Sequence, residues 1–152
     1  MSLTIVLDSS PLSTATRRVG IPEADACRRW IVECRRAGHG VVAPAIAYYE
    51  VARELERAGN QTGIQRLDGF CSQSGSYLPF TDSALKLAVT LWAQARNRGM
   101  PTADPKELDC DVLIAAQTLD LGLPSSDVVI ATMNVGHLSQ FVNARRWADI
   151  QP

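Results

Sequence analysis

Hydrophobic residues in this chain follow two patterns that alternate along its length. Residues 4–7 form an unbroken run, Thr-Ile-Val-Leu, which is typical of a strand buried on both faces of a parallel sheet. Residues 23–37 instead place apolar side chains at helical spacing, and Gly38 follows as a stop signal. The same reasoning predicts further strands at residues 41–43, 77–80, 127–132 and 147–150, and further helices at residues 45–58, 64–71, 82–98, 109–121 and 138–142.

The alternation of strands and helices predicts the fold class. Strands separated by helices form a parallel sheet with helices on both faces. At 152 residues the chain has the size of a single domain. We therefore expect one α/β domain over residues 1–152, with three layers and a central, mostly parallel sheet of about five strands. Residues 99–105 form the longest loop-like interval. In such folds ligands bind at the carboxyl ends of the strands.

Composition and charge narrow the functional classes. A hydrophobic content of 46% and a charged content of 20% are those of an ordinary soluble protein, and the net charge of -1 gives no overall attraction to nucleic acid or membranes. Thirteen of the 15 basic residues are Arg, often in doublets that can bind phosphate or simply coat a helix face. Because no signal peptide or membrane span is evident, we expect a cytoplasmic protein without a membrane partner.

The cysteines and histidines suggest no site of their own. The four cysteines contain no C-x-x-C pair and fall in predicted helices, so we expect buried apolar residues of a reduced protein and no zinc site. His39 and His137 are interpreted as surface or turn residues. A nucleotide-binding domain is disfavoured because the chain has no Gly-rich phosphate loop.

Four acidic residues are candidates for a site, although each also has an ordinary structural explanation. Asp8 directly follows the first strand and can cap a helix. A phosphatase of the haloacid dehalogenase type would need a second Asp two residues later, where the chain has Ser10. Asp109 and Asp111 fit the cap and first turn of a helix. Glu50 shares a helical stripe with charged residues, which indicates a solvated face.

Considered together, the acids resemble a known pattern. A strand-end Asp, a Glu one crossover later and an Asp opening the helix before a strand that ends in Thr-Met-Asn are similar to the arrangement in PIN-domain ribonucleases. The chain resembles the VapC-type toxins of bacterial toxin–antitoxin pairs over nearly its whole length. The motifs that carry this resemblance are I-V-L-D-S-S at 5–10, Y-E-V-A-R at 49–53, L-D-C-D-V-L-I-A-A at 108–116 and V-V-I-A-T-M-N-V-G-H-L-S-Q-F-V at 128–142.

The resemblance implies a metal site. Asp8, Glu50 and Asp111 match the family's metal-binding acids, which would hold Mg²⁺ or Mn²⁺ through hard oxygen ligands. Many members carry an acid or an Asn after the fourth strand, and here Asn134 stands without a neighbouring carboxylate. We therefore expect Asp109 to complete the set of metal ligands.

The resemblance also implies an activity, an endoribonuclease in which activated water attacks a phosphodiester of single-stranded RNA. Thr132 and Asn134 would orient the site or substrate, and Arg53 and Arg57 would contact backbone phosphates. The implied protein partners are a cognate antitoxin and a second copy in a homodimer. The alternative is a non-catalytic PIN-like module that binds RNA or a protein, and absence of metal binding would favour it.

Overall fold

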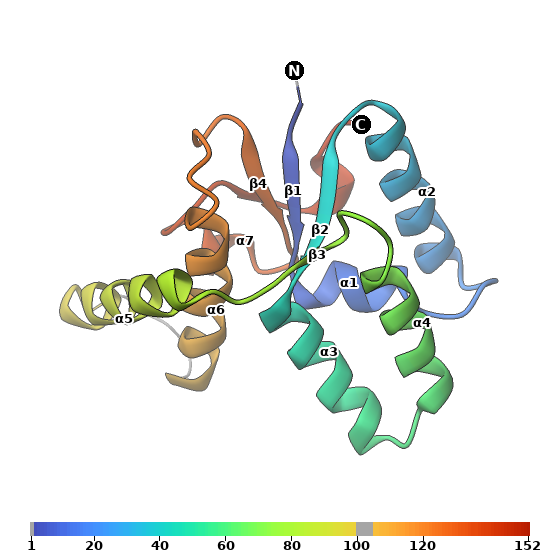
Figure 1. Ribbon diagram of the computed structural model, residues 1–152, viewed down its shortest axis with the longest axis horizontal. Coiled ribbons are helices and arrows are strands. Elements are labelled where there is room, and N and C mark those ends of the chain that lie inside the picture. The colour runs from blue at the N-terminus through green and yellow to red at the C-terminus, as the bar shows by residue number, and fades with distance from the viewer. Residues whose placement is uncertain (1, 100–104) are drawn as a thin grey trace.

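The computed structural model describes residues 2–99 and 105–152, and within them the strands form one parallel sheet (Figure 1). The strand order is β3-β2-β1-β4-β5. The bounds are Thr4–Leu7 for β1, Gly40–Pro44 for β2, Tyr77–Leu78 for β3, Val128–Ala131 for β4 and Ala144–Arg145 for β5. The chain runs outward from β1 to β3 and then returns to pair β4 with the other side of β1. The carboxyl ends of β1 and β4 therefore flank the point where the strand order reverses.

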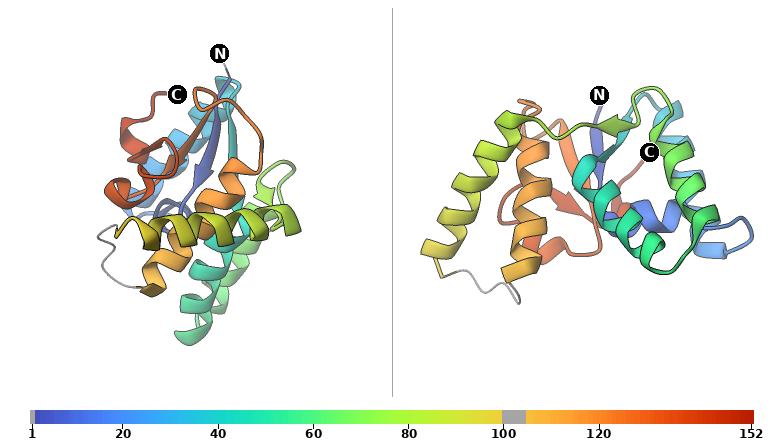
Figure 2. Two further views of the ribbon diagram at one scale, coloured as in Figure 1. Left: turned by 90° about the vertical axis from the view of Figure 1, so that its left-hand side faces the viewer. Right: turned by 60° about the horizontal axis from the view of Figure 1, so that its bottom comes forward.

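Helices cover both faces of this sheet, so the fold is a three-layer α/β/α sandwich (Figure 2). On one face lie α1 (Ser9–Ala15), α2 (Pro22–Arg36), α3 (Ala45–Arg57) and α4 (Gln61–Cys71). On the other face lie α6 (Pro105–Leu119) and α7 (Val135–Leu138), and α5 (Asp82–Asn97) packs against α6. None of the described helices is long and apolar enough to cross a lipid bilayer.

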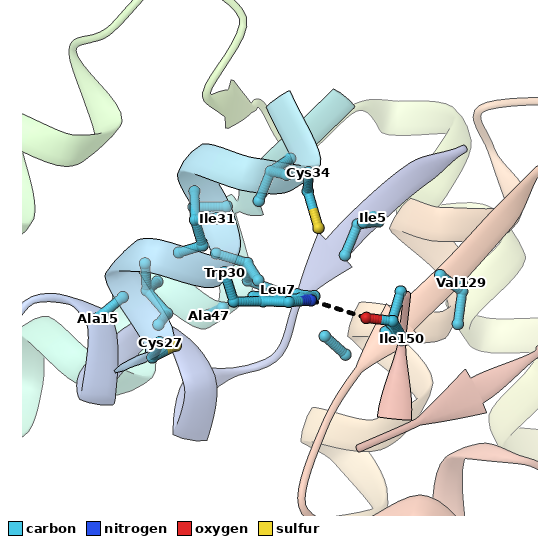
Figure 3. Close-up of a cluster of buried hydrophobic side chains, with 14 of the residues drawn as sticks. Ile5, Leu7, Ala15, Cys27, Trp30, Ile31, Cys34, Ala47, Val129 and Ile150 are labelled. Atoms are coloured by element: carbon cyan, nitrogen blue, oxygen red, sulfur yellow. Dashed lines mark hydrogen bonds between the residues drawn. The ribbon is translucent and has the colours of Figure 1, made fainter. Parts of the chain in front are cut away.

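The central strand explains why its sequence is hydrophobic without alternation. Ile5 and Leu7 belong to the core beneath α1–α4, whereas Val6 packs with Ile114 of α6 on the opposite face. All three strand residues are fully buried. Figure 3 shows the first of these cores, in which the Trp30 indole Nε1 donates a hydrogen bond of 2.8 Å to the Ile150 carbonyl. The core thus ties the end of the chain to α2.

The predicted fold class is confirmed, with corrections to several elements. The helix predicted at residues 138–142 is wrong, because the short helix α7 ends at Leu138, where the predicted one begins. The helix predicted at residues 109–121 begins four residues earlier, at Pro105, so Asp109 and Asp111 lie inside it and not at its cap and first turn.

Helix α1 was not predicted, because Ser9–Ala15 contains Pro11 and little helical periodicity, and its helix instead buries Leu12 and Ala15 in the core. The strand predicted at residues 147–150 is wrong: residues 147–149 form a 3₁₀ helix, and β5 pairs with β4 three residues earlier. The predicted loop at residues 99–105 lies, apart from its two ends, outside the described residues.

Candidate functional site

A cleft of about 470 Å³ opens at the carboxyl end of β1. Four parts of the chain meet there: the β1–α1 junction, α3, α6 and the segment after β4. The lining residues are Asp8, Ser9, Ser10, Glu50, Arg53, Cys110, Asp111, Met133 and Asn134. The cleft therefore brings Asp8, Glu50 and Asp111 together at the sheet edge where the topology places ligands.

A second hollow of about 460 Å³ lies between α1, α2 and α4 and is rich in arginine. Its cations already serve the fold. Arg28 donates hydrogen bonds to the Ala15 and Arg17 carbonyls, and Arg66 Nε donates to the Thr16 carbonyl at 2.8 Å. These contacts satisfy carbonyls at and just beyond the end of α1, as basic residues commonly do at a helix C-terminus. The acidic cleft is therefore the better candidate for chemistry.

Asp8 is held by hydrogen bonds to both of its carboxyl oxygens. The backbone amide of Ser9 donates to Asp8 Oδ1 at 2.7 Å, and the hydroxyl of Thr132 donates to Asp8 Oδ2 at 2.7 Å. Thr132 is fully buried, and its hydroxyl in turn accepts a hydrogen bond of 2.8 Å from the backbone amide of Asn134. Burial raises the pKa of Asp8, and the hydrogen bonds from Thr132 and Ser9 oppose that rise. The Thr132 hydroxyl thus fixes the direction of the Asp8 carboxylate.

Glu50 faces the cleft although its helical stripe indicated solvent. Arg53 and Arg57 on that stripe are exposed, whereas Glu50 is half-buried because α3 packs between α1 and α6. Burial, followed by the negative charge of Asp8, raises the pKa of Glu50 to about 7. Glu50 therefore carries a charge that the fold itself disfavours at neutral pH.

Asp111 lies on α6 and is 8% exposed. Its Oδ2 lies 3.6 Å from His137 Nδ1, and the same ring nitrogen lies 3.0 Å from Asn134 Nδ2. The interpretation of His137 as a surface or turn residue missed these contacts, which place its imidazole beside two residues that line the cleft. Because α7 starts directly after Asn134, the short helix positions Asn134 and His137 together.

Two residues expected at the site lie elsewhere. Asp109 is exposed and borders a separate groove with Trp92 on α5. Since two residues along a helix turn the chain by about 200°, Asp109 and Asp111 point to different sides of α6. Asp109 therefore does not line the cleft that Asp8, Glu50 and Asp111 share, and the structure gives no support to the expectation that it completes the metal set. Arg57 pairs with Glu54 at 2.8 Å with 76% of its side chain exposed, and it does not border the cleft.

Comparison by sequence does not place this chain, because no family model and no curated protein matches it. Solved structures do match. A chain of VapBC2 from Rickettsia felis, bound to a DNA fragment from its promoter, has a TM-score of 0.69 at 13% identity, covering 95% of this chain and 99% of that one. A chain of VapBC-1 from nontypeable Haemophilus influenzae matches with a TM-score of 0.65 at 16% identity, covering 97% of this chain and 100% of that one. A chain of DNA-bound VapBC from Salmonella typhimurium matches with a TM-score of 0.69 at 17% identity, covering 95% of this chain and 98% of that one.

The chain has the PIN-like fold of the VapC-type toxins. These identities establish a shared fold, so the chemistry has to be argued from the cleft itself. The three acids come from the end of β1, the middle of α3 and the first half of α6. The third position differs from the expectation of an Asp that opens its helix, because α6 begins at Pro105.

Sequence reasoning also missed the side chains of Ser9, Ser10, Cys110 and Met133, which line the cleft. Cys110 was expected to be a buried apolar residue, but it is only partly buried and lines the cleft beside Glu50. Burial and the negative charge of Glu50 raise the pKa of its thiol to about 11, so the thiol stays protonated at neutral pH. No sequence signal singled it out, because successive helix residues point about 100° apart and adjacency to an acid does not decide which face a side chain occupies.

The carboxylates of the cleft suit a hard divalent cation as ligands, although they are not arranged as a complete coordination site. No three His, Cys, Asp or Glu side chains among the described residues stand close enough together to hold an ion as they are arranged. The carboxylates of Asp8, Glu50 and Asp111 nevertheless line one cleft, and Asp8 and Asp111 each raise the pKa of Glu50. Carboxylate oxygens are the ligands that Mg²⁺ and Mn²⁺ prefer, and a cation would remove this repulsion.

Proposed function

We propose that the protein is a metal-dependent endoribonuclease in which Asp8, Glu50 and Asp111 hold Mg²⁺ or Mn²⁺. The observation that carries this proposal is the convergence of three carboxyl groups from three separate elements in one cleft. Burial raises the pKa of Asp8, and burial together with the charge of Asp8 raises that of Glu50. A fold gains nothing from such repulsion, so a bound cation is the simplest reason for the arrangement.

Each residue of the cleft has a distinct part in the proposed reaction. Asp8, Glu50 and Asp111 would hold the divalent ion, which when bound would supply an activated water and neutralise charge on the phosphate. Thr132 keeps Asp8 aimed into the cleft through its 2.7 Å hydrogen bond. Arg53 borders the cleft and can bind a backbone phosphate, and Asn134 can donate its amide to the substrate. Since the pKa of Glu50 is about 7, cation binding at neutral pH should release protons from it.

The proposed substrate is single-stranded RNA, because a phosphate must enter an acidic cleft that a regular duplex does not reach easily. The structures with the same fold are VapBC assemblies. By analogy with them we infer a cognate antitoxin as the partner of this chain, and we propose that the chain forms a homodimer.

A cleavage assay tests this proposal. Protein purified away from any co-expressed inhibitor should cut single-stranded RNA with Mn²⁺ or Mg²⁺ and should stop with a chelator. Asp8→Asn should abolish cutting, because it removes one ligand charge at nearly constant shape. Asp109→Asn is the matched control, since this acid stands two residues from Asp111 but outside the cleft, and it should cut like the wild type. Cutting by Asp8→Asn at the wild-type rate would refute the proposed site.

The second candidate is a non-catalytic PIN-like binding module. The observation that favours it is the lack of a finished three-ligand group among the described residues. RNA binding without cleavage, together with a melting temperature that does not respond to Mn²⁺, would select this alternative.

A further inference from the structure

Two neighbouring tyrosines on α3 serve different purposes. The Tyr48 hydroxyl donates a hydrogen bond of 2.7 Å to Asp68, and its ring packs edge-on against Tyr77 with ring centroids 6.4 Å apart. Tyr49 is 57% exposed and directly precedes Glu50 of the acidic cleft. The packing of α3 therefore accounts for Tyr48, whereas most of the Tyr49 ring remains open to solvent.

Tyr49 is coupled to the cleft through Arg53, one helical turn later. The guanidinium carbon of Arg53 lies 5.2 Å from the centroid of the Tyr49 ring. Arg53 also lines the acidic cleft and an adjoining hollow of about 300 Å³. Among the described residues that line the cleft, Arg53 alone is basic. The Tyr49 ring does not line the cleft itself, but it contacts the cation that does.

We propose that Tyr49 is a stacking platform for a nucleobase of the RNA, with the adjacent phosphate bound by Arg53. This inference rests on the proposed function and adds a base-binding subsite to it. Every nucleobase has a π face, so an exposed aromatic ring beside a phosphate-binding cation holds single strands with little sequence preference. A base can reach such a ring only when it is splayed out of a helix, which favours single-stranded over duplex RNA.

The chain contains a matched pair that tests whether the stack is only a helix-stabilising contact. On α5 the guanidinium carbon of Arg96 lies 5.7 Å from the ring of Trp92, again four residues apart, and Trp92 is 40% exposed. Trp92 borders an apolar groove with Leu85 and Val89, and neither Asp8 nor Glu50 lines that groove. If both pairs only stabilised their helices, substitutions at the two rings would act alike on RNA.

The test measures RNA affinity with a chelator present, so that binding is separated from cleavage. The ligands are a short single-stranded RNA and an oligomer of equal length and charge without bases. Tyr49→Leu should bind the RNA about tenfold more weakly, the loss expected for one stacked base. Tyr49→Phe keeps the ring but loses the hydrogen bond between its side chain and Arg53, so it should retain most of the wild-type affinity. The wild type should prefer RNA over the baseless oligomer by more than Tyr49→Leu does. Trp92→Leu should leave all of these affinities unchanged.

The salt dependence of binding separates stacking from charge. Tyr49→Leu should keep the wild-type slope of affinity against salt because no cation is removed, whereas Arg53→Gln should lower it. A fluorescent adenine analogue in the RNA should be quenched by the wild type and by Tyr49→Phe. This second readout does not depend on the Leu variant, and absence of quenching would overturn the proposal.

Cleavage of the same RNA with Mn²⁺ distinguishes a failure of the stacking subsite from a failure of the proposed nuclease function. A wild type that cuts the RNA while Tyr49→Leu binds it equally well would overturn the stacking subsite and leave the nuclease in place. A wild type that neither binds nor cuts RNA would overturn both. If Tyr49→Leu keeps its RNA affinity and instead loses a protein partner, the exposed ring belongs to a protein interface and the stacking proposal is wrong.

Discussion

The two ends of β1 differ in how their polar groups are used. At the amino end, backbone groups find ordinary partners: the Leu3 amide donates to His39 Nδ1 at 3.0 Å, and the Thr4 amide donates to the Asp127 carbonyl at 2.8 Å. The Gly40 amide donates to the Leu3 carbonyl at 2.9 Å. These contacts complete the sheet at this edge.

At the carboxyl end the backbone is also satisfied, since the Asp8 amide donates to the Ala131 carbonyl at 2.9 Å. The side chains differ, because Asp8, Glu50 and Asp111 share a cleft. Their burial and proximity raise the pKa of Glu50 to about 7. One end of the strand thus serves the fold alone, while the other end holds charges that the fold would be more stable without.

The largest expected effect concerns the hydroxyl that orients Asp8. Thr132→Val should keep the shape of the side chain and lower Mn²⁺ affinity or RNA cleavage by about 10–100-fold, as loss of a residue that orients a metal ligand usually does. Thr118→Val is the matched control, because Thr118 is equally buried but donates to the Ile114 carbonyl inside α6. Calorimetric titration with Mn²⁺ measures the difference, and equal affinities for the two variants would contradict the role of Thr132.

A smaller effect is expected on stability against pH. Glu50 has a pKa of about 7 when folded against an ordinary value of 4.5. Between these values the folded state binds more protons than the unfolded state, so stability should fall as pH rises through this window. Glu50→Gln should remove this fall and raise the melting temperature above pH 7 by roughly 2–4 °C without metal. Below pH 4.5 the variant and the wild type should melt together.

The control for this pH effect is Glu56→Gln, an exposed glutamate on the same helix, which should retain the wild-type pH dependence. Mg²⁺ should restore the stability of the wild type above pH 7 and do less for Glu50→Gln. If the melting temperatures of the wild type and Glu50→Gln changed in parallel with pH, the ionised Glu50 side chain would not destabilise the fold, contrary to this prediction.

The smallest expected effects come from the two histidines, one at each end of β1. His39→Ala removes the acceptor of the Leu3 amide and should lower the free energy of unfolding by about 1 kcal/mol. Its response to Mn²⁺ should stay that of the wild type. His137→Ala should weaken the Mn²⁺ response, because His137 contacts both Asn134 and Asp111. Denaturant unfolding with and without Mn²⁺ measures the free energy of unfolding of each variant and its increase on adding the ion. A normal increase in His137→Ala together with a reduced increase in His39→Ala would contradict the different roles given to the two ends of β1.

The parts of the fold with a strong local signal could be predicted from the sequence. Strands β1 and β4 are runs of β-branched and apolar residues because both of their faces are buried. Helix α1 and strand β5 could not be predicted in the same way. Helix α1 is stabilised by the packing of Leu12 in the core, and strand β5 is two residues long and is defined by its pairing with β4. Such elements depend on tertiary contacts that a local pattern does not contain.

The site was predictable only in part, for a related reason. The position of Asp8 at the end of a buried strand indicated the functional edge of the sheet without further information. Whether Glu50 faces solvent or a cleft depends on how α3 sits between α1 and α6, which its own periodicity does not reveal. Asp109 and Asp111 are two residues apart on one helix, and only the direction in which α6 packs decides which of them faces the cleft.

The most direct test of the central claim is to locate Mn²⁺ by anomalous diffraction from crystals of the metal-soaked protein. We expect an anomalous peak in the cleft among the carboxylates of Asp8, Glu50 and Asp111, and no such peak in crystals of Asp8→Asn. A wild-type protein that cleaves RNA with Mn²⁺ but binds the ion at another place would contradict the assignment of these three acids. Equal peaks in the wild type and in Asp8→Asn would contradict the part given to Asp8.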